Sequence, residues 1–101
     1  MDRIIQLSEI INKYNDYAKS GSIVYEISKD IISNGGIVII DMKGIESVPT
    51  NFMNTSFGAL ITNCGFDKTK QSFKFRNILK SQLSRFAKYF ADYQKILEET
   101  N

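Results

Sequence analysis

Residues 36–52, GIVIIDMKGIESVPTNF, decide how this chain folds. Residues 37–40 are four consecutive apolar, β-branched side chains, a run that is typical of a strand buried on both faces. Asp41 ends the strand, and Pro49 fixes the end of the following loop before the next helix. The segment therefore predicts a strand, a loop and a helix in that order.

The helix after Pro49 is expected to cover residues 51–63 and to end at Gly65, because glycine accepts the backbone conformation that closes a helix. Its apolar residues recur on one side of the helix. They are Met53, Phe57, Leu60, Ile61 and Cys64.

Downstream, we expect a polar turn at residues 67–71 and then a half-exposed strand over residues 72–78, with Lys74 and Arg76 pointing outward. Ser81 is the expected cap of a last helix. The apolar stripe of that helix consists of Leu83, Phe86, Ala87, Phe90 and Leu97.

Upstream, residues 3–7 are suited to a short strand, whereas residues 8–20 fit a helix or a loop equally well. The Ser-Gly-Ser run at residues 20–22 reads as a break before another helix. That helix contains Val24, Ile27 and Ile31 at helical spacing, and it ends at residues 34–36.

Strands that alternate with helices predict an α/β fold. We expect a single small domain over residues 1–101, with a mixed or mostly parallel sheet covered by helices. A chain of 101 residues has the length of one such domain.

Composition limits the classes of function. The chain has no histidine, which removes the commonest general base and metal ligand, and neither paired acids nor metal-ligand spacing occurs. We therefore expect neither an enzyme nor a metal site nor a cofactor. The single cysteine, Cys64, and the lack of a secretory or membrane-spanning run indicate the reducing cytoplasm.

The start of the 51–63 helix is the strongest candidate site, because helix N-terminal amides hold anions. Thr50 or Asn51 is placed as the N-cap, and capping alone explains these residue types. Two functional interpretations remain open, which are a docking surface and a binding site for a small ligand or nucleotide phosphate near residues 50–54. In the second, Asp41 and Lys43 would add polar contacts.

Other candidates are weaker. Asp41 alone at a strand end is more consistent with fixing a loop than with catalysis. Cys64 is expected to be a small buried apolar residue rather than a nucleophile. Basic and aromatic residues interleave over residues 74–88, but a net charge of only +2 argues against nucleic acid as a partner.

The run from residue 36 to residue 66 resembles the STAS-like domains of unknown function, which are related to anti-sigma-factor antagonists and to the cytoplasmic domains of sulfate transporters. Several features are in register. They are the strand ending in Asp41, the apolar loop at 44–48, the turn at 50–52, the Phe57–Gly58 pair and Gly65.

The resemblance implies a non-enzymatic regulatory or signalling module that docks a protein partner, such as a kinase-like ATPase, through the loop and helix at residues 47–57. Where antagonists carry a serine that a partner kinase phosphorylates, this chain has Asn51, so Thr50 is the nearest hydroxyl. Self-association is also open. The expected interaction or switch surface is Thr50, Asn51, Asn54 and Thr55, with Phe52 as its packing anchor.

Overall fold

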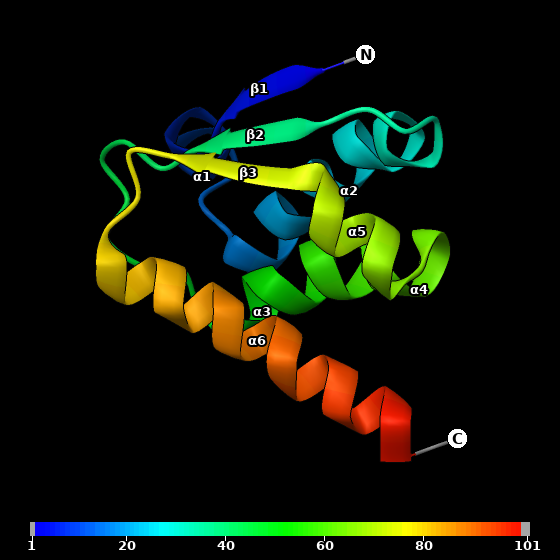
Figure 1. Ribbon diagram of the computed structural model, residues 1–101. Coiled ribbons are helices and arrows are strands. Elements are labelled where there is room, and N and C mark those ends of the chain that lie inside the picture. Colours follow the sequence, from blue (N-terminus) through cyan, green and yellow to red (C-terminus); the bar gives the residue numbers. More distant parts are fainter. Residues whose placement is uncertain (1, 100–101) are drawn as a thin grey trace.

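Three short strands form a parallel sheet in the order β1-β2-β3 in the computed structural model, which describes residues 2–99 (Figure 1). The register places Ile5, Ile40 and Phe75 side by side across the sheet. The elements along the chain are β1 (Arg3–Gln6), α1 (Leu7–Tyr14), α2 (Tyr17–Ser33), β2 (Val38–Asp41), α3 (Thr50–Met53), the π-helical turn η1 (Asn54–Gly58), α4 (Ala59–Cys64), α5 (Phe66–Ser72), β3 (Phe73–Arg76) and α6 (Lys80–Glu99). The predicted α/β class and the parallel sheet are confirmed.

Helices cover one face of the sheet more fully than the other. Val38 and Ile40 are buried on the face against which the helices pack, and α3 to α6 lie on that side (Figure 1). On the opposite face Ile39 is only half-buried, and its neighbour Ile4 is 46% exposed. The expectation of a strand buried on both faces was therefore wrong, because the second face of this small sheet is left partly open.

Helix α2 runs without interruption through the Ser-Gly-Ser segment that the sequence suggested was a break. The actual break lies earlier, where Asn15 adopts a left-handed conformation with φ of 50° and Asp16 caps α2 by accepting a hydrogen bond from the Lys19 amide at 3.0 Å. Residues 8–20 are thus helical on both sides of this short turn. Gly21 lies within α2 because the helix comes very close to α3 and η1 there.

Two further boundaries differ from expectation. The polar turn predicted at 67–71 is helix α5, in which the Thr69 amide donates to the Gly65 carbonyl, and its buried Thr69 packs inward. Ser81 lies inside the first turn of α6 rather than capping it, since the Leu83 amide donates to the Leu79 carbonyl. The sequence did not predict α5 because residues 67–71 are polar. The residue of α5 that packs on the hydrophobic core, Phe66, comes just before that run.

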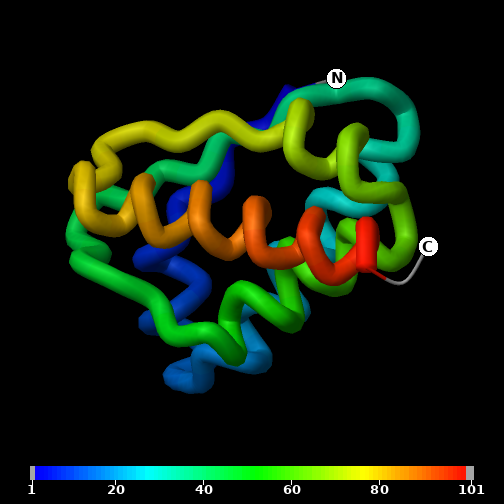
Figure 2. Tube along the Cα trace, turned by 60° about the horizontal axis from the view of Figure 1, so that its bottom comes forward, coloured from blue at the N-terminus to red at the C-terminus, as the bar shows by residue number. Residues whose placement is uncertain are grey.

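A cluster of aromatic rings holds α6 on the rest of the domain. The Phe57 ring meets Phe73, Phe86 and Phe90 with centroids 4.8, 5.4 and 5.5 Å away, and Phe75 stacks on Phe86 at 4.8 Å. Figure 2 shows α6 crossing between β3 and the α3–α4 helix. In the predicted apolar stripe only Phe86 and Phe90 are buried, whereas Leu83, Ala87 and Leu97 are exposed.

None of the helices within residues 2–99 is both long and apolar enough to cross a lipid bilayer.

Gly21 is the position at which the fold is least tolerant of an added side chain. A Cβ there would lie 2.0 Å from the Thr55 hydroxyl oxygen and 2.5 Å from the Phe52 carbonyl oxygen, so a helix must shift. We expect Gly21→Ala to lower the free energy of unfolding by about 1–3 kcal/mol, measured by urea denaturation. Ser22→Ala, at the exposed neighbouring position, is the control. A Gly21→Ala variant more stable than wild type, as helix propensity alone predicts, would contradict this packing.

Candidate functional site

The first turn of the α3 helix presents polar side chains on a fixed base. Thr50, Asn51 and Asn54 are exposed, whereas Phe52 and Met53 are buried in the core. The Phe52 ring is buried beneath the turn, in the place expected of the packing anchor of this surface.

The N-cap differs from the expected one. Pro49 takes the cap position in an extended conformation, and its carbonyl accepts hydrogen bonds from the Phe52 amide at 3.1 Å and the Met53 amide at 3.4 Å. No side chain caps this helix, so the hydroxyl of Thr50 and the amide of Asn51 are not used in capping. Capping therefore does not explain these two residue types.

The residues of the predicted surface lie beside two different helices, α6 and α2. Thr50 and Asn54 face α6, where Thr50 receives a hydrogen bond from Arg85 at 3.4 Å and Asn54 accepts one from the Tyr89 hydroxyl at 2.9 Å. Thr55 lies on the α2 side, where its hydroxyl donates to the carbonyls of Asn51 at 3.0 Å and Phe52 at 3.2 Å. Thr55 is thus half-buried and engaged in packing.

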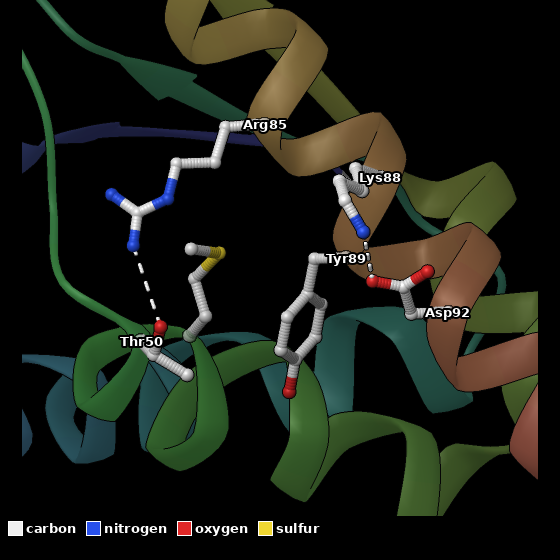
Figure 3. Close-up of a pocket in the computed structure, with 6 residues that line it drawn as sticks. Thr50, Arg85, Lys88, Tyr89 and Asp92 are labelled. Carbon is white, nitrogen blue, oxygen red and sulfur yellow. Dashed lines mark hydrogen bonds and ion pairs between the residues drawn. The ribbon is translucent and has the colours of Figure 1, made fainter.

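A cleft of about 250 Å³ lies between α3 and α6 (Figure 3). The Arg85 guanidinium lies across one end of this cleft and donates a hydrogen bond to the Val48 carbonyl. The Lys88 ammonium is paired with the Asp92 carboxylate at 2.7 Å. The lining consists of Thr50, Met53, Arg85, Lys88, Tyr89 and Asp92.

Arg85, Lys88, Tyr89 and Asp92 were not among the predicted site residues. Their spacing of three and four residues places them on one helix face, and this is the signal that could have grouped them. It could not show that this face meets Thr50.

Tyr89 is a fixed, neutral hydrogen-bond donor in this cleft. Burial, followed by the field of Tyr93, raises the pKa of the Tyr89 phenol to about 12. The hydroxyl therefore stays protonated over the physiological range and donates to the Asn54 side chain.

Asp41 belongs to a different part of the molecule, at the carboxyl end of β2. Its carboxylate accepts hydrogen bonds from the Asn77 side chain and the Lys43 amide, each at 3.0 Å. The Asn77 hydrogen bond first, and then that of Lys43, holds the pKa of the Asp41 carboxyl below its ordinary value. Asp41 thereby joins the loop after β2 to the residue that follows β3.

The four residues that a small ligand was expected to contact are not gathered in one cleft. Thr50 lines the cleft beside α6. Asn77, the partner of Asp41, lines a second cleft of about 280 Å³ formed by Met42, Gly44, Ile45, Glu46, Asn77 and Leu79. Lys43 is exposed beside that second cleft, and Asn51 is exposed on α3.

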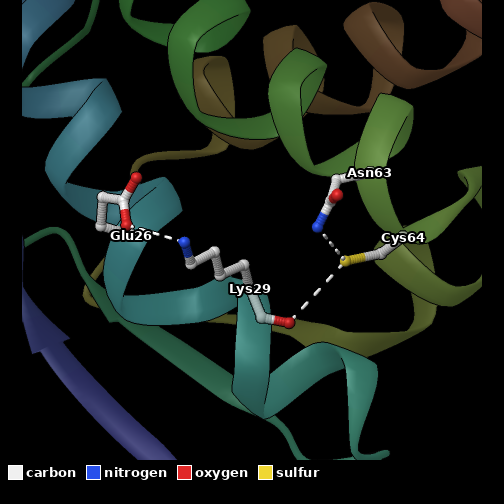
Figure 4. Close-up of polar contacts among 4 residues, drawn as sticks. All are labelled: Glu26, Lys29, Asn63 and Cys64. Carbon is white, nitrogen blue, oxygen red and sulfur yellow. Dashed lines mark hydrogen bonds and ion pairs between the residues drawn. The ribbon is translucent and has the colours of Figure 1, made fainter.

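Cys64 is half-buried at the end of α4 (Figure 4). Its sulfur lies 3.8 Å from the Lys29 carbonyl and 3.7 Å from the Asn63 side-chain nitrogen. The Lys29 ammonium is bound to Glu26 at 3.0 Å, so it is directed to that carboxylate. Cys64 packs against the hydrophobic core at its edge.

The basic and aromatic residues at 74–88 do not form one surface. Phe73 and Phe86 are buried in the aromatic cluster, so their faces are not available for stacking on bases. Lys74 is exposed on β3, whereas Arg85 faces the cleft on α6. Within residues 2–99, no group of three or more histidine, cysteine or acidic residues is arranged to hold a metal ion.

Comparison with known proteins identifies one relationship. A family described as a STAS-like domain of unknown function matches residues 20–83. No curated protein and no solved structure matches the chain. Arg85 and the rest of the α6 face of the cleft lie beyond the matched segment.

Removal of the Tyr89 hydroxyl should have two effects on stability. Tyr89→Phe loses one hydrogen bond and should lower the free energy of unfolding by about 0.5–1.5 kcal/mol at neutral pH. Because the pKa of the phenol is about 12 in the folded protein and about 10 in an unfolded chain, wild type should lose stability as pH rises from 10 and level off near 12. The variant should lose less over that range. Chemical denaturation from pH 7 to 12 measures both effects, with Tyr17→Phe, at an exposed tyrosine, as the control.

Asp41 should make stability dependent on acid pH. Because its pKa is lowered by folding, its contribution is fully present above the unfolded value of about 3.9 and is lost as pH falls through the folded pKa. Asp41→Asn should therefore reduce the thermal midpoint at pH 7 and flatten its fall below pH 4. Glu98→Gln, at an exposed position on α6, is the matched control. An Asp41→Asn profile parallel to that of wild type would contradict this assignment.

Proposed function

Since the chain belongs to the family of STAS-like domains of unknown function, we propose that it is a non-enzymatic regulatory module that binds a protein partner through residues 47–57, the docking segment. The observation that supports this most is the rigid presentation of exposed Thr50, Asn51 and Asn54 above the buried Phe52 and Met53. Polar side chains on a preformed base lose little entropy when a partner binds them.

The packing around the docking segment supports the same function. Phe57, within η1, is fixed by rings from β3 and α6, and the adjoining Gly21 brings α2 into contact with Thr55 and the Phe52 carbonyl. A surface that is fixed from three sides can bind a protein with little rearrangement. By the resemblance to anti-sigma-factor antagonists, the expected partner is a kinase-like ATPase or another regulator.

The site chemistry supports binding more than catalysis. The chain has no histidine to act as a general base, and the Asp41 carboxylate is engaged by Asn77 and the Lys43 amide. The first cleft presents a guanidinium, an ion pair and a phenol whose pKa of about 12 is unsuited to proton transfer near neutral pH.

Thr50 is the candidate for a regulatory phosphate. Its hydroxyl is exposed at the helix start and lies 3.4 Å from an Arg85 guanidinium nitrogen. A phosphate there would carry a charge of about −1.5 to −2 and could form charge-assisted hydrogen bonds with that guanidinium. Asn51, which stands where the resemblance to antagonists places the phosphorylated serine, offers no hydroxyl.

The proposal is tested by purifying the tagged chain from the cells that naturally make it, and then identifying its partners and phosphorylated residues by mass spectrometry. We expect a stoichiometric protein partner that Asn51→Arg removes, because the substitution places a long cation on the docking segment. Asn12→Arg makes the same change at an exposed position on α1 and should keep the partner.

A partner that both arginine variants retain would place the interface elsewhere. Recovery of the unmodified chain alone, with no associated protein, would exclude the proposed docking role in those cells. The phosphorylation proposal has a separate outcome, because the same spectra report whether Thr50 carries phosphate.

A further inference from the structure

We propose that the cleft between α3 and α6 receives an acidic side chain of the protein partner, and that Arg85 binds its carboxylate. This inference rests on the proposed docking function and adds the chemistry of the partner. It concerns residues that lie outside the segment matched by the family, since α6 beyond residue 83 is not part of that match.

Arg85 retains unused capacity to donate hydrogen bonds. A guanidinium has five N–H donors, and this one donates to the Val48 carbonyl and, over a long 3.4 Å, to the Thr50 hydroxyl. Arg85 is half-buried and lines the cleft (Figure 3). A carboxylate can therefore bind the remaining donors and replace the weak contact with Thr50.

The Val48 contact prepares the guanidinium for this role. Val48 is buried, so its carbonyl is a fixed acceptor for Arg85. A guanidinium held in this way loses less side-chain freedom on binding than a solvated one.

The charges of the cleft favour an anion. Lys88 is neutralised by Asp92 at 2.7 Å, whereas within residues 2–99 no carboxylate lies within ion-pair distance of Arg85. Two cations and one anion leave a net charge of about +1 on the lining. An unpaired, half-buried guanidinium in such a place attracts a negatively charged group.

The volume and the lining of the cleft favour a side chain over a nucleotide as its occupant. The cleft has about 250 Å³, which is below the roughly 300–1,000 Å³ of pockets that enclose small ligands. The Met53 side chain and the Tyr89 ring provide apolar walls beside the polar groups. A glutamate fits this arrangement, because its methylene groups can contact these walls while its carboxylate reaches Arg85.

The test uses a random-peptide display library selected on the full chain and on two variants with the same charge change. Arg85→Glu reverses the charge of the cleft, and Lys74→Glu reverses an exposed charge on β3. We expect wild type and Lys74→Glu to enrich peptides with a shared Asp or Glu, and Arg85→Glu to lose them. Replacing that acid by its amide in a synthetic peptide should weaken binding by about tenfold or more.

Arg85→Gln protects the test against a folding defect, because it removes the positive charge without placing a carboxylate beside the buried Val48 carbonyl. This variant should keep the wild-type circular dichroism spectrum and lose acidic peptides to the same extent. Peptides without a shared acid, acidic peptides that Arg85→Glu retains, or displacement of the peptide by ATP would each overturn the inference. Peptides that lack an acid but depend on Asn51 would leave the docking function intact, so the two failures are distinguishable.

Discussion

The contact of the Phe57 ring with the rings of β3 and α6, edge-to-face with Phe73 and Phe86 and tilted by 49° with Phe90, is the interaction on which the arrangement of this domain depends. Phe57 is fully buried on η1, and its ring centroid lies within 5.5 Å of those of Phe73, Phe86 and Phe90. One side chain thus connects the sheet, the central helix and the last helix. Aromatic pairs of this geometry stabilise a fold beyond their buried area, so α6 is positioned by its rings.

This constraint also places the candidate site. Because Phe86 and Phe90 hold α6 against Phe57, the adjoining face of α6 reaches the docking segment, where Arg85 donates to Thr50 and Tyr89 donates to Asn54. The close approach of α2 at Gly21 fixes the same segment from its other side. The exposed residues are therefore rigid because their neighbours in sequence, Phe52 and Met53, are core residues.

The sequence was sufficient for the elements with strong periodicity and insufficient where tertiary contacts decide. The apolar run before Asp41 predicted the central strand, although it could not show that only one face would be well covered. Gly21 suggested a break, because the sequence does not reveal that a neighbouring helix requires a residue without a Cβ. The α5 helix was missed because all its residues after the first, Phe66, are polar.

For the candidate site, Thr50, Asn51 and Asn54 were recognisable from the hydroxyl and amide residues that follow Pro49. Their partner α6 was not, because nearly thirty-five residues separate Thr50 from Arg85 and no local pattern reports a contact at that distance. Asp41 and Lys43 were grouped with them by proximity in sequence. The loop after β2 instead turns toward Asn77, because the end of a parallel strand lies beside the end of its neighbour.

The Arg85 guanidinium takes part in both proposals, which are the phosphorylation of Thr50 and the binding of an acidic partner. It therefore determines whether the phosphate strengthens or weakens partner binding. Arg85 can donate to a phosphate on Thr50 or to the carboxylate of a partner, and both acceptors approach the same donors beside Thr50. A phosphate at this position would neutralise the guanidinium and repel the incoming carboxylate. Modification of Thr50 would therefore weaken binding of an acidic partner.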